Sequence, residues 1–410
     1  MGKSETWEIA QGVSWLACFT AWLGLGLAQP AWGQAGLETA VARWRQKYDV
    51  AGLAAAGIRG TNLAFTLHQG WADLDRKLPV TDETLFRVAS ISKVFTSVAA
   101  MQLWERGLLD LDQPVGHWLG FAVSHPVGAA RPITVRQILA HNSGLRDGAD
   151  YDRFLACTYT NPAVSLAEVL SPRGRFYGPS LFTTNPPGTQ YEYSNLGFVV
   201  LGTVVEKITG ERFEARCQAG ILDPLGLKAT FNTDRLGPED WNRLAVLYRW
   251  EQGRWQPQAE NWRGQRPPSR IQAGYRPGDN AIYSGPQGGL RATARDLARF
   301  LIWFRDPASH PGILKPETAR LMRAEAGPGA DPTNDQRGLG LHRTRNLVPG
   351  QTWIGHNGEA YGLLSGMYFQ EEGPYGMVFI MNGCRPGRDE QGFYPVEKEL
   401  AGLLLEHLRK

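Results

Sequence analysis

Ser90 and Lys93 belong to a Ser-x-x-Lys motif, Ser90-Ile91-Ser92-Lys93. In a helix, residues three apart lie on one face, so the Ser90 hydroxyl and the Lys93 amine can meet. A serine hydroxyl is a poor nucleophile until a base takes its proton. A lysine amine can be that base once burial or a nearby cation lowers its pKa from about 10.4. The spacing predicts a nucleophile with its base, although this motif alone is also typical of a helix with a surface lysine.

A second group, Tyr193-Ser194-Asn195, follows a Pro-Pro-Gly-Thr turn at 186–189 and precedes an apolar helical pattern. A phenol and an amide two positions apart on a loop can point at one site. The phenol can relay a proton, and the amide can hold Lys93 or a substrate amide. Taken alone, the group is equally typical of a helix cap by Ser194 or Asn195.

A third group, His356-Asn357-Gly358, lies at the start of a strand pattern near the C-terminus. A glycine there lets a ligand approach the strand backbone closely. A β-turn is the alternative interpretation.

Hydrophobic periodicity predicts the elements that must position these groups. A helix is expected from Ser90 to Gly107, with Val94, Val98, Met101 and Leu103 along its apolar stripe. The other expected elements are a helix beginning near 38, strands within 51–60 and 62–70, helices at 133–145 and 196–208, a helix within 288–301, strands at 352–356, 363–370 and 376–382, and a helix at 397–408. Thr134 and Thr293 are the expected N-caps of the helices at 133–145 and 288–301. Gly144 is the expected end of the helix at 133–145.

The order of these elements predicts an α/β (α+β) fold. Strands cluster at both ends of the chain and helices in the middle, which favours one antiparallel sheet flanked by helices, with a mainly helical lobe. We expect the α/β lobe to comprise about 38–85 and 286–410, and the helical lobe about 86–285, with the active site between them. The long loop-like stretch 231–285 is expected to wall a cleft.

The N-terminus is typical of a secretory signal peptide. Residues 13–28 are apolar and precede Ala31-Trp32-Gly33, a small-x-small cleavage pattern. We therefore expect a signal peptide at 1–33, a catalytic domain at 34–410 and an exported, periplasmic or secreted, protein. An uncleaved anchor helix is the alternative. No other stretch is long and apolar enough for a membrane span.

Composition excludes several other classes of function. The formal net charge of +3 carries no basic run, so no nucleic-acid partner is expected. The eight His are dispersed, and Cys157, Cys217 and Cys384 match no zinc spacing, so neither metal nor cofactor is expected. At most one disulfide can form among these cysteines, and its pairing stays open. No serine lies in a Gly-x-Ser-x-Gly motif.

Together, the three groups and their flanks resemble the serine β-lactamase and penicillin-binding superfamily, especially its class C β-lactamase-related branch of esterases, D-aminopeptidases and D-alanyl-D-alanine peptidases. The similarity extends over about 38–408, with matching blocks at 72–115, 133–145, 186–210, 223–230, 288–301 and 355–362. The resemblance implies a β-lactamase/transpeptidase-like fold.

The resemblance also implies a role for each motif residue. Ser90 resembles the nucleophile and Lys93 its base. Tyr193 and Asn195 resemble the second motif, and His356 and Gly358 the third. The main-chain N–H groups of Ser90 and Glu359 correspond by position to the oxyanion hole, where one donor typically contributes about 10²–10³ in rate.

The third motif departs from the Lys-Thr-Gly of many relatives that handle β-lactams. A neutral His356 binds a carboxylate less well than an ammonium does, and the Glu359 carboxylate would repel one. We therefore expect a serine hydrolase of esterase or peptidase type, acting through an acyl-enzyme on neutral or amine-bearing small molecules or peptides. The alternatives are a β-lactamase or D-alanyl-D-alanine carboxypeptidase, a transacylase, and a non-catalytic penicillin-binding-like protein.

Overall fold

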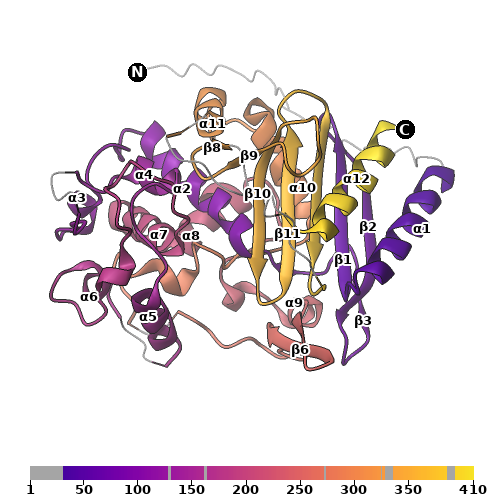
Figure 1. Cartoon of the computed structure of the whole chain (residues 1–410), viewed down its shortest axis with the longest axis horizontal. Coiled ribbons are helices and arrows are strands. Elements are labelled where there is room, and N and C mark those ends of the chain that lie inside the picture. Colours follow the sequence, from indigo (N-terminus) through magenta and orange to yellow (C-terminus); the bar gives the residue numbers. More distant parts are fainter. Residues whose placement is uncertain are drawn as a thin grey trace, which may run out of the picture.

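The computed structural model describes residues 31–127, 131–160, 164–271, 274–324, 326–327, 336–385 and 393–410. Residues 1–30, which hold most of the predicted signal peptide, lie outside these ranges. A large antiparallel sheet and a mainly helical part lie side by side (Figure 1). Within the described ranges, no helix combines the length and apolarity needed to cross a bilayer.

The main sheet has eight strands in the order β3-β2-β1-β12-β11-β10-β9-β8. The first strands of the chain therefore pair with the last, as in the register Leu53↔Met381. This arrangement confirms the predicted fold class. The strands are β1 (Gly52–Arg59), β2 (Asn62–Asp73), β3 (Leu78–Pro79), β8 (Gln336–Arg337), β9 (His342–Thr344), β10 (Trp353–Ala360), β11 (Leu363–Gln370) and β12 (Tyr375–Met381).

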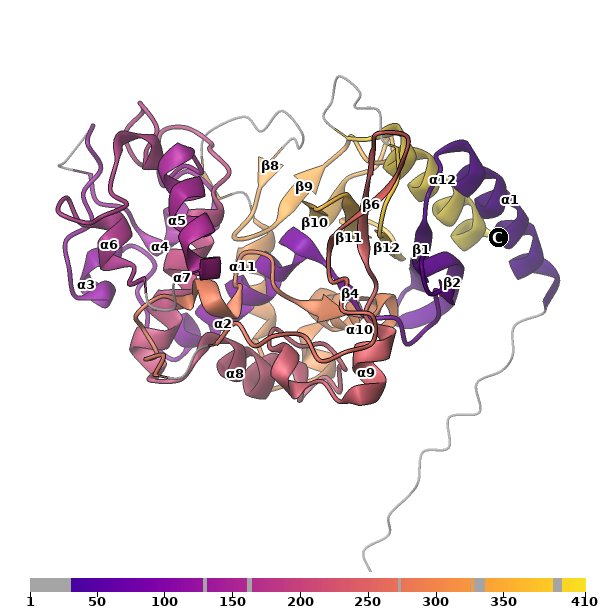
Figure 2. The same cartoon turned by 90° about the horizontal axis from the view of Figure 1, so that it is seen from below.

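Helices cover both faces of this sheet (Figure 2). On one face, α1 (Ala31–Lys47) and α12 (Pro395–Arg409) enclose a core that includes Trp44, Trp353 and Leu404. On the other face lies α10 (Ala294–Arg305), within the larger core. The central strands are buried on both faces, which explains their continuous apolar sequence.

The helical part surrounds α2 (Ser92–Glu105), which is buried along most of its length, and packs α7 (Asn195–Thr209) against it. The remaining α-helices of the described residues are α3 (Val115–Leu119), α4 (Val135–Leu139), α5 (Ala149–Thr160), α6 (Ala167–Leu170), α8 (Phe213–Cys217), α9 (Pro238–Arg243) and α11 (Pro316–Arg323). The described residues also form two small strand pairs, β4 (Phe86–Arg87) with β7 (Arg291–Ala292) and β5 (Leu247–Glu251) with β6 (Arg254–Ala259).

The structure corrects the helix predicted at 133–145. Thr134 forms the expected cap, sharing a capping box with Gln137, but α4 ends at Leu139. The chain then turns at His141, whose φ of 54° lies in the left-handed region, and Gly144 is not the stop. As a result, residues 141–145 leave the helix and run toward the start of α7, where the main-chain N–H of Ser194 donates to His141 Nδ1.

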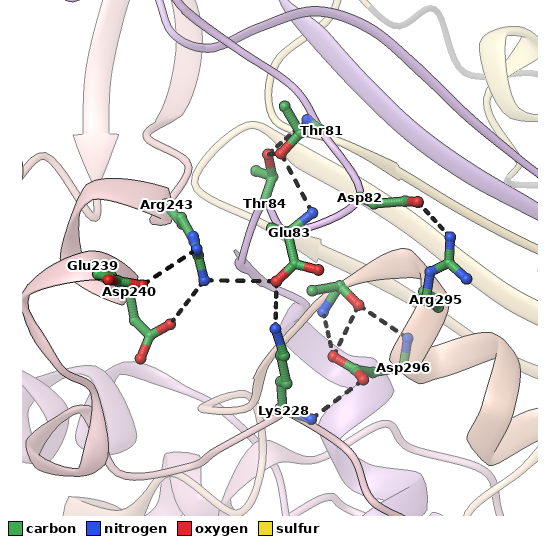
Figure 3. A network of polar contacts seen from close by, with 11 residues as sticks. Thr81, Asp82, Glu83, Thr84, Lys228, Glu239, Asp240, Arg243, Arg295 and Asp296 are labelled. Carbon is green, nitrogen blue, oxygen red and sulfur yellow. Dashed lines mark hydrogen bonds and ion pairs between the residues drawn. The ribbon is translucent and has the colours of Figure 1, made fainter.

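A polar network ties the loop before β4 to the elements around it (Figure 3). Glu83 forms ion pairs with Lys228 and Arg243. Asp296 accepts hydrogen bonds from the Thr293 hydroxyl and from the main-chain N–H of Lys228. The loop that leads to Ser90 is thereby connected to α9 and to the start of α10.

Candidate active site

Ser90 lies in a 3₁₀ turn, η1 (Ala89–Ile91), immediately before α2. Ala89 has a φ of 47°, a conformation that costs a non-glycine residue energy and that is found at functional turns. The strand β10 approaches this turn closely. A Cβ on Gly358 would lie 2.5 Å from the Val88 carbonyl oxygen and 3.2 Å from the Ser90 nitrogen. Glycine at 358 is therefore required for the strand backbone to reach the serine.

Lys93 is completely buried, and its Nζ lies 3.1 Å from Ser90 Oγ. Nζ also donates to Asn195 Oδ1 at 2.7 Å and to the main-chain oxygen of Gln287 at 2.6 Å. Burial lowers the pKa of Lys93 to about 7, although the negative charge of Asp147 acts in the opposite direction and raises that pKa. About half of the Lys93 amines are therefore neutral near pH 7.

The contacts of Lys93 also orient its amine. A neutral amine has two N–H bonds and one lone pair. The oxygens of Asn195 and Gln287 each accept one N–H, so the lone pair is left for the Ser90 hydroxyl. This is the arrangement that general-base catalysis requires.

Tyr193 completes the group around Ser90. Its hydroxyl donates to Ser90 Oγ at 2.6 Å, and its ring lies 4.8 Å from Lys93 Nζ. Burial raises the pKa of Tyr193 well above the usual value for tyrosine, so the phenol stays protonated and serves as a donor. The structure therefore joins Tyr193, Ser90, Lys93 and Asn195, in that order, in one chain of hydrogen bonds.

Tyr193 and Asn195 are held by the start of α7. Ser194 is the N-cap and accepts from the main-chain N–H of Gly197. Asp147 accepts from the main-chain N–H groups of Asn195 at 2.7 Å and Leu196 at 2.9 Å. A carboxylate is favourable at a helix N-terminus, where unpaired N–H groups concentrate positive charge.

Sequence reasoning missed Asp147, the Gln287 carbonyl and His141. The ring of His141 stacks on Tyr193 with a centroid distance of 4.4 Å. His141 lies in the block 133–145 that resembles the superfamily, and Asp147 follows that block closely. The resemblance of this block was the sequence signal that could have indicated both residues. The Gln287 contact is made by the main chain, so its residue type carries no signal.

His356 lies buried beside this group, with its ring against His342 at a centroid distance of 3.8 Å. Burial and the nearby charge of Lys93 lower the pKa of His356 well below its ordinary value. The imidazole is therefore neutral, and the third motif contributes no positive charge of its own.

The expected effect of the Glu359 carboxylate is wrong. Successive side chains of a strand point to opposite faces, so Glu359 and Gly358 diverge. Glu359 accepts a hydrogen bond from the Tyr394 hydroxyl at 2.7 Å, just ahead of α12 on the far face of the sheet. Its carboxylate cannot repel a substrate at Ser90. The role predicted for its main-chain N–H does not depend on that side chain and stays a prediction.

The described residues contain no group of three His, Cys, Asp or Glu placed to hold a metal ion. The fold and the contacts of Ser90 define the class of serine hydrolases. The chain belongs to the Beta-lactamase family, whose model matches residues 37–400.

Named relatives agree with this class. The chain is 31% identical to Esterase EstB of Burkholderia gladioli over 309 residues, which cover 70% of this chain and 74% of that protein. It is 27% identical to Penicillin-binding protein 4* of Bacillus subtilis over 214 residues, covering 52% of this chain and 45% of that protein. The chain is therefore a serine hydrolase of esterase or peptidase type, with a small-molecule or peptide substrate.

Solved structures share the fold. D-amino acid amidase from Ochrobactrum anthropi SV3, complexed with L-phenylalanine amide, superposes with a TM-score of 0.66 at 25% identity, covering 92% of this chain and 97% of the amidase. An octameric penicillin-binding protein homologue from Pyrococcus abyssi superposes with a TM-score of 0.68 at 23% identity, covering 91% and 77% of the two chains.

Proposed function

We propose that this protein hydrolyses an ester or amide through an acyl-enzyme on Ser90. Lys93 accepts the Ser90 proton, and Oγ forms a bond to the substrate carbonyl carbon. The main-chain N–H groups of Ser90 and Glu359 donate to the resulting oxyanion. The proton on Lys93 passes through the Tyr193 hydroxyl to the leaving oxygen or nitrogen, and the bond from the carbonyl carbon to that atom breaks. Lys93 then accepts a proton from a water molecule, whose oxygen bonds to the acyl carbon. The bond from that carbon to Ser90 Oγ breaks, Oγ takes the proton back from Lys93, and the acid is released.

The observation that carries this proposal is the buried contact between Lys93 Nζ and Ser90 Oγ at 3.1 Å. A lysine on an exposed helix face would keep its proton at neutral pH and could not act as a base. Here burial lowers the pKa of Lys93 to about 7, and two oxygens fix the direction of its N–H groups. The similarity to Esterase EstB supports ester substrates.

Covalent labelling tests the nucleophile. A fluorophosphonate should add one phosphonyl group to the protein, and intact-mass spectrometry followed by peptide mapping should locate it on Ser90. Ser90→Ala should abolish both labelling and hydrolysis of p-nitrophenyl esters. Labelling at another serine, or turnover that survives in Ser90→Ala, would contradict the proposal.

Removal of the base tests the mechanism. Lys93→Ala should lower kcat for p-nitrophenyl butyrate by about 10²–10⁴-fold, the usual contribution of a general base. Lys77→Ala is the matched control, since Lys77 is exposed near the turn between β2 and β3 and should leave kcat unchanged. Circular dichroism should show that both variants are folded. A folded Lys93→Ala enzyme with near-normal kcat would rule out the proposed base.

We also propose that the enzyme acts outside the cytoplasmic membrane, after cleavage behind residue 33. Residues 13–28 and the pattern Ala31-Trp32-Gly33 support this. Expression of the full chain in a bacterial host, followed by N-terminal sequencing of the periplasmic and cytoplasmic fractions, should find the mature chain starting at Gln34 in the periplasm. An intact N-terminus confined to the cytoplasm would contradict export.

A further inference from the structure

A cavity of about 540 Å³ lies beside the turn that carries Ser90. Most of its wall comes from residues 231–233, 257–262, 267–271 and 283–291, within the long segment between α8 and α10 that was expected to wall a cleft. Arg87, Tyr159 and Tyr361 close the remaining side. Tyr361 begins the turn from β10 to β11, only three positions after Gly358.

The cavity and the reactive serine share one wall, the loop 285–289. Gly285 and Gly289 line the cavity. Between them, the carbonyl oxygen of Gln287 accepts the hydrogen bond from Lys93. Arg87, three positions before Ser90, lines the cavity and donates from Nε to the carbonyl oxygen of Gly288 at 3.0 Å. A group bound in the cavity would therefore lie next to the site of acylation.

The charge of the cavity wall is strongly positive. Three guanidinium groups line it, those of Arg87, Arg270 and Arg291, and Glu260 is the only acidic residue among the lining residues that the structure describes. Glu260 forms an ion pair with Arg291 at 2.6 Å, and both side chains are buried. Among the described lining residues, Arg87 and Arg270 therefore form no ion pair with a carboxylate, although the charge of Arg87 also acts on Glu260.

Arg270 is the less satisfied of those two. Its guanidinium lies over the ring of Tyr159 at 4.7 Å, and among the described residues its buried Nη2 has no hydrogen-bond partner. Leaving a buried charged donor unpaired is costly, whereas a carboxylate can accept two parallel N–H bonds from a guanidinium.

The positive charge of the wall also acts on a pair of tyrosines at the cavity edge. The hydroxyls of Tyr159 and Tyr361 lie 3.5 Å apart, and Arg87 lies over the Tyr361 ring at 4.9 Å. Burial by itself would raise the pKa of Tyr361, but the charges of Arg87 and Arg270 and the hydrogen bonds with Tyr159 and Arg87 together outweigh burial and lower that pKa. The cavity edge therefore favours negative charge.

Much of the rest of the wall is apolar or aromatic, with Phe231, Trp262, Tyr283 and three prolines, beside a smaller number of neutral polar side chains. Such a surface favours a hydrocarbon or aryl body, while the guanidinium groups favour an anionic end. We propose that this cavity binds the acyl side chain of the substrate and selects acyl groups that end in a carboxylate. This inference rests on the proposed acyl-enzyme function. It places carboxylate recognition in the cavity rather than at the neutral His356.

Two esters with the same acyl chain test the selection. In p-nitrophenyl hydrogen adipate the chain ends in a carboxylate, and in p-nitrophenyl methyl adipate that end is a neutral ester. The wild-type kcat/KM should be about 10-fold or more higher for the anionic ester, as expected for one charge-assisted contact. Added salt should reduce this ratio, because ions screen the attraction.

Arg270→Gln should lower the ratio toward one, and Arg270→Lys, which keeps the charge, should retain part of it. Arg266→Gln is the matched control, since it removes the same charge from an exposed arginine paired with Asp234 outside the cavity wall, and its ratio should stay at the wild-type value. Using a ratio within each variant cancels a general loss of activity.

A wild-type ratio near one, with Ser90-dependent hydrolysis of both esters, would overturn the inference and leave the proposed function intact. An unchanged ratio in Arg270→Gln would likewise overturn it. If neither ester were hydrolysed in a Ser90-dependent manner, both the inference and the proposed function would be contradicted.

Discussion

The amine of Lys93 must be neutral at the moment it accepts a proton, so its pKa sets the acidic limit of activity. Burial lowers that pKa to about 7. We predict that kcat/KM for a p-nitrophenyl ester rises with pH along a single limb with an apparent pKa near 7 and then levels off. Below that pH the amine is protonated and its lone pair is occupied. A limb near 10, the ordinary range of lysine, would contradict the assignment of the base.

Asp147 is predicted to act as a positioning residue. Asp147→Asn should weaken the start of α7 and lower kcat by about 10-fold, because Tyr193 and Asn195 would be held less firmly. The negative charge of Asp147 raises the pKa of Lys93, so its removal should move the acidic limb of the pH profile to lower pH. A purely structural role would leave that limb where it is.

The control for this variant is Asp152→Asn, the same chemical change at an exposed position in the first turn of α5. Its pH profile should match that of the wild type. If Asp147→Asn lowered kcat without moving the limb, the electrostatic part of its role would be wrong.

At the residue scale, each motif taken alone allowed another interpretation, and the resemblance of the three motifs together to one superfamily predicted which side chains meet around Ser90. The direction of Glu359 could not be predicted, because one step along a strand reverses the face of a side chain. Asp147 escaped notice because it lies 47 positions before Ser194, and only tertiary packing brings its carboxylate to the start of α7.

At the scale of elements, the network around Glu83 that Figure 3 draws contains an exposed ion pair and a buried capping contact. Glu83 and its partner Lys228 have side chains that are 44% and 61% exposed, so water competes with their ion pair. We predict that Glu83→Ala costs less than about 1 kcal/mol of unfolding free energy. Asp296→Ala should cost about 1–3 kcal/mol, because it removes the buried carboxylate that completes the capping box of α10 with Thr293.

Urea unfolding of both variants measures this difference. Equal costs would mean that exposed ion pairs hold the loop before Ser90 as firmly as the buried cap holds α10.

Periodicity predicted the long helices and the central strands, such as α7 and β11, because each buries a continuous face. It failed in the loop-like stretch 231–285, which contains the β5–β6 hairpin. The end of β5 and all of β6 are not buried, and they carry Arg, Gln and Glu. Such strands show no apolar alternation from which to predict them.

For the whole molecule, the core under α1 and α12 is separate from the core around Ser90. We predict that Leu404→Ala, at a fully buried position in α12, costs about 2–5 kcal/mol of unfolding free energy while kcat stays close to the wild-type value. The control is Leu108→Ala at a side chain that is 51% exposed, where the cost should stay within about 0.5 kcal/mol.

Urea unfolding and ester hydrolysis on the same samples provide the measurement. A loss of kcat in Leu404→Ala that parallels its loss of stability would show that the two cores are coupled.

The pairing of β1 with β12 has a consequence for biosynthesis. On the ribosome, Leu53 emerges on the order of half a minute before its partner Met381 is made. Until then the β1–β2 hairpin presents an unpaired strand edge and the apolar residues that α12 later covers, a surface suited to chaperones that hold chains unfolded. A chain interrupted before β12 would keep that surface exposed and be a target for quality-control proteases.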